Sequence, residues 1–232
     1  MINAVNLKKT YNGTTVLDID SLDIPKGQSF GLIGNNGAGK TTFFSLLLDL
    51  IQPSQGKITS NNVVISESED WKPFTSAYID ENFLIGYLTP EEYFYFVGEL
   101  RNWNKADVDT FLQKHIEFFN DEILNKKKYI RDLSKGNAKK VGIVAALIGN
   151  PEVIILDEPF ANLDPSTQIR LKRIIKELAE DPKVTILVSS HDLQHTVEVS
   201  DRIVVLNKGI VVKDIIPTTQ TLSELEEYFS IQ

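Results

Sequence analysis

Short apolar runs of strand length alternate with helical patterns along most of the chain. Residues 153–156 are a continuous apolar run of the kind found in buried parallel strands, residues 29–33 are a short apolar run of strand length, and residues 183–190 are predicted as another core strand. The residues between them have apolar positions at helical spacing, most clearly in the stripe Leu171, Ile174, Ile175 and Leu178. This alternation predicts an α/β fold with a parallel sheet.

Shorter strands are predicted at both ends of this pattern. The N-terminal residues 2–7 and 16–24 flank an Asn12-Gly13 turn, which predicts antiparallel strands. Apolar helices are expected at residues 42–51 and 141–148, and a short terminal helix carries Leu222, Leu225 and Phe229. The remaining predicted strands are residues 57–59, 63–65 and 77–79 and a hairpin of 202–206 with 210–213.

A stretch of different character begins at Thr89. Thr89 and Pro90, followed by two glutamates, are typical of a capped helix start, and a second helix is expected over residues 106–119. We therefore predict a single domain over residues 1–232, in which a helical insertion of approximately residues 80–150 interrupts the α/β core. We expect His115, in the second of these helices, to lie at the surface.

The segment between the strand at 29–33 and the helix that follows has the spacing of a phosphate-binding loop. Its glycines allow backbone N–H groups to converge on a phosphate at a helix N-terminus. Lys40 can reach the β- and γ-oxygens, and Thr41 can ligate Mg²⁺. A glycine-rich turn without a ligand is the alternative, but the strand and helix on either side argue against it. The candidate ATP-binding residues are Asn35, Asn36, Gly37, Ala38, Gly39, Lys40, Thr41 and Thr42.

Four further polar residues follow predicted strands or begin a helix. Asp157 and Glu158 stand at the end of the 153–156 strand, where open α/β sheets place ligand chemistry. His191 follows the 183–190 strand. Asp164 precedes Pro165, a pair that also has the simpler explanation of a helix N-cap.

Composition narrows the class of protein. The chain has 232 residues, no cysteine and a formal net charge of −8, which excludes disulfides and thiolate chemistry and argues against a nucleic-acid partner. Lys126, Lys127 and Lys128, with Arg131, are interpreted as a solvated face. No uninterrupted apolar stretch is long enough to cross a bilayer, so we expect a cytosolic chain.

These motifs, together with the pentad Leu133-Ser134-Lys135-Gly136-Asn137, occur in an order that resembles the nucleotide-binding subunit of ABC transporters. The resemblance covers nearly the whole chain. It implies a P-loop NTPase with a three-layer core, an N-terminal antiparallel β-subdomain and the helical insertion. It also implies an ATPase that uses ATP and Mg²⁺ and closes head to tail as a homodimer, or as a heterodimer with a similar ATPase.

The resemblance assigns roles to individual residues. It makes Glu158, His191 and Lys40 catalytic: Glu158 would position or deprotonate the attacking water, and His191 would contact the γ-phosphate. Asp157 would hold Mg²⁺ through water, with Thr41 as a ligand. Tyr11 would be the adenine platform. The opposite subunit would complete each site with Ser134, Lys135, Gly136 and Asp164.

The sequence departs from the family pattern at two places. Lys135 stands where the family usually has a glycine, and Asn137 where it has a glutamine; we expect Lys135 to attract the γ-phosphate across the dimer. Counting back from Leu88 places the usual coupling-loop glutamine at Asp80, an acid that can still bind Mg²⁺ or orient water. An acid there resembles the bacterial drug and bacteriocin export branch.

The expected function is therefore an ATP-hydrolysing subunit that powers export through a separate membrane-spanning partner, on the inner face of the cell membrane. The alternative is a soluble ABC ATPase that drives an assembly or repair complex, which only partners distinguish. A binding module without turnover conflicts with the presence of Lys40, Asp157, Glu158 and His191.

Overall fold

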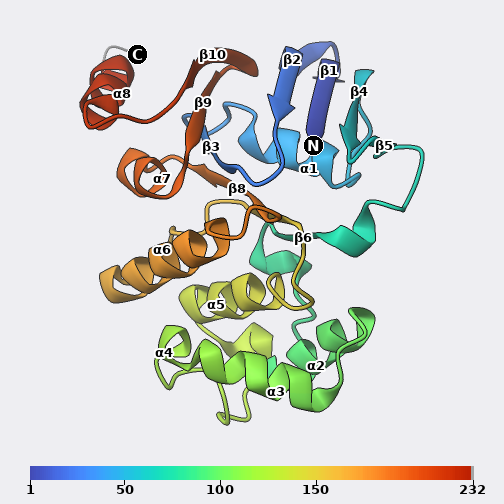
Figure 1. The fold of residues 1–232 in the computed structure, drawn as a ribbon, viewed down its shortest axis with the longest axis vertical. Coiled ribbons are helices and arrows are strands. Elements are labelled where there is room, and N and C mark those ends of the chain that lie inside the picture. The colour runs from blue at the N-terminus through green and yellow to red at the C-terminus, as the bar shows by residue number, and fades with distance from the viewer. Residues whose placement is uncertain (231–232) are drawn as a thin grey trace.

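Two β-sheets contain the strands of the computed structural model, which describes residues 1–230 (Figure 1). The smaller sheet is antiparallel, in the order β2-β1-β4-β5. Asn12 and Gly13 join its first two strands with φ angles of 49° and 83°, as a tight hairpin turn requires, so the predicted hairpin is confirmed. The strands are β1 (Ile2–Tyr11), β2 (Thr14–Ile24), β4 (Gln55–Ser60) and β5 (Val63–Val64).

The larger sheet has six strands in the order β10-β9-β3-β8-β7-β6. All neighbours are parallel except β10, which forms an antiparallel hairpin with β9. The predicted buried strands are therefore confirmed as parallel. Their bounds are β3 (Ser29–Ile33), β6 (Thr75–Tyr78), β7 (Val153–Leu156), β8 (Thr185–Ser190), β9 (Arg202–Asn207) and β10 (Ile210–Ile215).

Both faces of the larger sheet are covered, because alternate residues of its strands pack into different cores. Ile155 and Leu187 pack with the smaller sheet and with α1 (Lys40–Leu47). Their neighbours Ile154 and Ile186 pack with the helices of the opposite face. These helices include α5 (Lys135–Ala145) and α6 (Pro165–Ala179). The result is the predicted three-layer α/β core.

Helices from the middle of the chain gather at the end of the molecule opposite the antiparallel sheet (Figure 1). They pack around Phe94, Phe118 and Phe119. The first helix begins with a full capping box between Thr89 and Glu92. The helices are α2 (Pro90–Leu100), α3 (Lys105–Lys114) and α4 (Ile116–Phe119), with 3₁₀ turns at Lys72–Phe74, Glu81–Phe83 and Ile130–Asp132.

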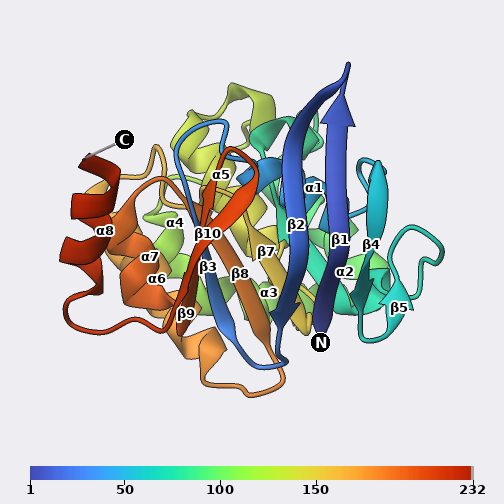
Figure 2. The same cartoon turned by 90° about the horizontal axis from the view of Figure 1, so that it is seen from above.

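The last elements, α7 (Leu193–Val199) and α8 (Thr221–Ser230), lie beside β9 and β10 (Figure 2). Leu225 of α8 packs with Ile33, Ile203 and Val205 in a small separate core. Within residues 1–230, no helix combines the length and the apolar character needed to span a bilayer.

The predicted helix bounds were wrong in three places. The first helix ends at Leu47 rather than at residue 51, because Asp49 adopts a positive φ of 53°. The helix predicted over 106–119 is two helices, since His115 leaves helical geometry and its N–H bonds to the carbonyl of Leu112. The helix predicted over 141–148 begins earlier, at Lys135, and ends at Ala145.

The prediction that His115 lies at the surface was also wrong. Its ring packs on Phe111, with 4.4 Å between ring centroids, and its Nδ1 lies 3.0 Å from the Phe111 carbonyl oxygen. The side chain is half-buried as a result. Burial lowers the pKa of His115 from its ordinary value.

Candidate functional site

The parallel strands end at one edge of the larger sheet, and the loops after β3, β6, β7 and β8 carry most of the predicted site residues. The phosphate loop follows β3, Asp157 and Glu158 follow β7, and His191 follows β8. The register aligns these ends, because Ile33 pairs with Ser190. The structure thereby brings segments that are more than 100 residues apart in sequence to one place.

The phosphate loop presents unused backbone donors. Among residues 1–230, no protein acceptor pairs with the N–H groups of Asn36, Gly37, Gly39, Lys40, Thr41 or Thr42. Most of them belong to the first turn of α1, where helix geometry leaves N–H groups free and favours an anion. Gly39 holds a φ of 106°, which turns the chain into this helix. The loop therefore has the structure of an anion cradle.

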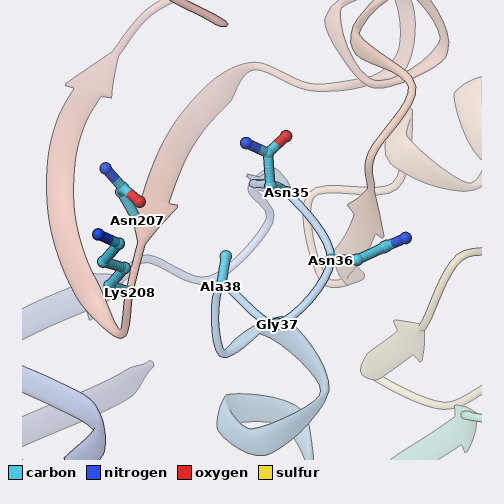
Figure 3. Close-up of a pocket in the computed structure, with 6 residues that line it drawn as sticks. All are labelled: Asn35, Asn36, Gly37, Ala38, Asn207 and Lys208. Atoms are coloured by element: carbon cyan, nitrogen blue, oxygen red, sulfur yellow. The ribbon is translucent and has the colours of Figure 1, made fainter. Parts of the chain in front are cut away.

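A cavity of about 410 Å³ lies beside this loop (Figure 3). Asn35, Gly37 and Ala38 line it on one side, and Asn207 and Lys208 line it from the β9–β10 turn. The turn is fixed against the loop because the N–H of Gly209 donates to the Ala38 carbonyl at 2.9 Å. Asn207 and Lys208 were not predicted as site residues.

Lys40 is buried, with 6% of its surface exposed. Its Nζ donates to the Gly34 carbonyl at 2.7 Å and lies 3.2 Å from Glu158 Oε1. The position of Gly34 requires a glycine, since a Cβ there would lie 2.5 Å from the Leu206 carbonyl oxygen. The phosphate-loop lysine and the predicted catalytic carboxylate thus form an ion pair at the edge of the sheet.

Thr41 and Asp157 form the second contact between the two loops. Thr41 Oγ1 donates to Asp157 Oδ2 at 2.5 Å, and Ser189 Oγ donates to Asp157 Oδ1. Burial raises the pKa of the Asp157 carboxyl, and these two hydrogen bonds act against that rise. A hydroxyl and a carboxylate side by side are oxygen donors of the kind that Mg²⁺ prefers, so the residues present fit this ion.

Glu158 has the most constrained backbone of the site. Its φ is 46°, in the left-handed region that a non-glycine residue adopts only when its surroundings enforce it. The N–H donates to Ser189 Oγ at 2.9 Å, and the carbonyl accepts from Lys139 Nζ at 2.7 Å. The carboxylate lies 2.8 Å from His191 Nδ1. Backbone and side chain are therefore both held in place.

The residues predicted to act in trans lie elsewhere on the chain. Ser134 and Asp164 are the N-caps of α5 and α6, which confirms the simpler explanation of Asp164. Gly136 packs against the 161–164 loop, since a Cβ there would lie 2.8 Å from the Asn162 carbonyl oxygen. Lys135 is exposed. Within the described residues, no hydrogen bond joins any of the four to the phosphate loop.

Two other predicted residues have no hydrogen bond to the phosphate loop within residues 1–230. Asp80 accepts hydrogen bonds from the N–H and side-chain amide of Asn82, and among residues 1–230 no hydrogen bond links it to Thr41 or Asp157. Tyr11 is 46% exposed at the end of β1, with Lys9 Nζ 4.7 Å from its ring centroid.

Sequence reasoning missed Ser189 and Lys139, which hold the two peptide groups of Glu158. The sequence indicated only that Ser189 belongs to a predicted strand. The alternation of side chains along that strand did not show on which face of the sheet Ser189 lies. Lys139 gave no signal, because a lysine in an amphipathic helix is normally solvated.

Taken together, a phosphate loop on an inner strand of a mainly parallel sheet and an aspartate at the end of another strand define a P-loop NTPase.

Comparison with known proteins gives the family. The ABC transporter family model matches residues 17–161. An uncharacterised ABC transporter ATP-binding protein of Methanocaldococcus jannaschii is 34% identical over 221 residues, which cover 90% of this chain and 74% of that protein. The chain belongs to the ABC transporter family and corresponds to its ATP-binding component.

Two further similarities agree with this assignment. The bacitracin transport ATP-binding protein of Enterococcus faecalis is 31% identical over 217 residues, which cover 93% of this chain and 69% of that protein. A dimeric ATP-binding cassette solved in a post-hydrolysis state with ADP and Pi has a TM-score of 0.82 at 22% identity. The match covers 94% of this chain and 99% of the solved chain, and it shows a shared fold.

Replacing Ser189 by alanine tests how the two acidic residues are held. Ser189→Ala leaves the Glu158 N–H without its acceptor and removes the donor to Asp157 Oδ1, while Thr41 still donates to Oδ2, so we expect the free energy of unfolding to fall by about 1–3 kcal/mol. Ser60→Ala is the matched control, because Ser60 is equally buried but its Oγ has no hydrogen-bond partner within residues 1–230. Urea denaturation measures both, and equal stabilities of the two variants would contradict the assigned network.

Proposed function

We propose that this chain is the ATP-hydrolysing subunit of an ABC transporter and powers export through a separate membrane-spanning partner. The observation that carries the proposal is the junction of Lys40, Thr41, Asp157 and Glu158, in which a phosphate loop meets two carboxylates at one sheet edge. In this proposal the whole chain is one ABC ATPase domain, and residues 80–150 are its helical insertion.

The contacts of the site support a hydrolytic mechanism. The free N–H groups of Asn36, Gly37 and residues 39–42 and the Lys40 ammonium bind the phosphates of ATP, so Lys40 exchanges its contact with Glu158 for the phosphate oxygens. The Glu158 carboxylate, released from Lys40 and still oriented by His191, accepts a proton from the attacking water. Catalysis then consists mainly of positioning and charge stabilisation.

Magnesium completes the site in this proposal. Thr41 and Asp157 would hold the ion, Asp157 through water, and when bound it would neutralise charge on the phosphate oxygens. The described residues supply two adjacent oxygen donors, and Mg²⁺ usually keeps several waters and phosphate oxygens as its other ligands. Asp80 is a candidate ligand only after the 79–82 loop releases its hydrogen bonds to Asn82.

Dimer closure explains the residues that lie away from the phosphate loop. Two copies arranged head to tail would place Ser134, Lys135, Gly136 and Asp164 of one subunit against the nucleotide of the other. The start of α5 suits this role, since Ser134 caps a helix N-terminus and Lys135 is exposed beside it. The homodimer is the simplest form, and a heterodimer with a similar ATPase has the same geometry.

The helical insertion offers a docking surface for the membrane-spanning partner. Phe83, Tyr87 and Leu100 are between 61% and 70% exposed, and a partner helix would cover apolar surface of this kind. A cavity of about 230 Å³ lies next to Phe83 and Tyr93. A partner helix bound there would keep the chain on the cytoplasmic face of the membrane. The bacitracin transport relative supports a transport role.

Replacing the proposed base tests hydrolysis. We expect Glu158→Gln to retain ATP binding and to lower the steady ATPase rate about 10²- to 10⁴-fold, since its amide is a poor proton acceptor. Glu152→Gln is the control, because Glu152 forms an ion pair with Lys26 outside the site. A phosphate-release assay and binding of a fluorescent ATP analogue give the two readings. An unchanged rate in the Glu158 variant would refute the assigned role.

Replacing Lys135 tests the dimer. Lys135→Gly removes an exposed cation from the start of α5, so we expect weaker ATP-dependent dimerisation and a smaller dependence on salt concentration. Lys127→Gly is the control. It removes the same charge, and glycine adopts the positive φ of 51° that Lys127 already has. Analytical ultracentrifugation of the Glu158→Gln background at several salt concentrations measures both. Equal affinities and salt slopes for the two variants would exclude the attraction.

The partner is tested by purification. We expect the tagged chain, extracted from native membranes in mild detergent, to carry a multi-span membrane protein in near-equal amount. A Phe83→Ser, Tyr87→Ser double variant should lose that protein and keep its ATPase activity, because neither side chain belongs to the phosphate site. Recovery of a soluble assembly or nucleic-acid repair complex instead would favour the alternative function of an assembly or repair ATPase.

A further inference from the structure

Lys139 is a buried lysine at the back of the site. It lies one turn along α5 from Gly136, and 5% of its surface is exposed. Among residues 1–230, no carboxylate lies within ion-pair distance of its Nζ, whereas the adjacent Lys140 pairs with Glu122 at 2.9 Å. A buried ammonium without a direct counter-charge is costly, so its other contacts deserve a functional explanation.

Its closest acceptor is the carbonyl of Glu158, at 2.7 Å. That carbonyl belongs to the residue with φ 46° that carries the proposed base. Since Ser189 holds the N–H of the same residue, Lys139 and Ser189 fix the two peptide groups that flank the Glu158 Cα. The left-handed turn determines where the carboxylate points, and it persists only while both groups remain bonded.

Tyr78 forms the other wall around the Lys139 ammonium. Its ring centroid lies 5.7 Å from Nζ, and the ring packs on Gly142, where a Cβ would lie 2.3 Å from the ring. The Tyr78 hydroxyl donates to Glu81 Oε2 at 3.2 Å. A chain of contacts thus runs from the Glu158 carbonyl through Lys139 and Tyr78 to the 80–82 turn.

The electrostatic surroundings suit a cation. Burial lowers the pKa of Lys139, and the carboxylates of Glu81, Glu158, Asp157 and Asp80 act in the opposite direction. An apolar side chain would fill the same space, but it would leave the Glu158 carbonyl without its lysine donor and would remove a positive charge that acts on these four acids.

We propose that Lys139 is a positioning residue for ATP hydrolysis, whose ammonium holds the Glu158 turn so that the carboxylate faces the attacking water. The inference rests on the proposed function, in which Glu158 is the base. Within residues 1–230, no hydrogen bond joins Lys139 to the phosphate loop. Its removal is therefore expected to lower kcat and to leave nucleotide affinity unchanged.

Three variants test this inference. Lys139→Met keeps the length of the side chain but removes the donor, and we expect kcat to fall by roughly ten- to a hundredfold, the loss that follows from one charged hydrogen bond. Lys139→Gln restores an N–H donor, so kcat should return to within about threefold of the wild type. Lys140→Met, the control, removes a buried lysine that faces Glu122 and should leave kcat within about twofold.

Two further measurements separate positioning from stability. The Kd of a fluorescent ATP analogue should agree within about twofold among all variants, and activities are compared at a temperature where each variant is folded by circular dichroism. A crystal structure of Lys139→Met should show Glu158 outside the positive φ region. A wild-type kcat in Lys139→Met, an equal loss in Lys140→Met, or no recovery in Lys139→Gln would overturn the inference.

Failure of this inference differs from failure of the proposed function. If the wild-type chain hydrolyses ATP and the Glu158→Gln variant does not, the proposed ATPase function holds regardless of the result for the Lys139 variants. A wild-type rate in Lys139→Met then refutes the positioning role alone. A wild-type chain that neither binds nor hydrolyses ATP would refute both.

Discussion

The common direction of strands β3, β6, β7 and β8 is the constraint on which the site depends. The residues that follow parallel strands lie at the same edge of the sheet. The phosphate loop, the Asp157–Glu158 pair and His191 therefore meet although they follow different strands. Both faces of this sheet are buried, which fixes the register, because a slip of one residue would turn apolar side chains such as Ile155 into the wrong core. The packing of the sheet therefore determines the positions of the site residues at this edge.

Within that frame, a strained turn is held by a dense polar network. Glu158 adopts a left-handed backbone between two bonded peptide groups, and its carboxylate contacts Lys40 and His191. The ammonium groups of Lys40 and Lys139 are buried on either side of this turn. The packing of the sheet stabilises this turn, and the buried ammonium groups of Lys40 and Lys139 each have a hydrogen-bond partner.

Sequence patterns predicted the parts of the structure that depend on local rules. The phosphate loop, the Asn12-Gly13 hairpin and the Asp164 cap are set by backbone conformation over a few residues, and the buried strands by continuous apolar runs. The end of α1 and the break at His115 depend on packing and on single φ angles, which periodicity does not record. Ser189 and Lys139 act on Glu158 across 31 and 19 residues, so their roles emerge only from tertiary contacts.

The ion pair between Lys40 and Glu158 has a consequence for the cycle of the protein between nucleotides. An empty phosphate loop would leave a buried ammonium without a counter-charge, and the Glu158 carboxylate occupies that role as an internal mimic of a phosphate oxygen. The chain therefore supplies its own counter-charge to the buried Lys40 ammonium. Under the proposed function, an incoming nucleotide would displace an anion that belongs to the chain itself, and the displaced carboxylate would be the proposed base.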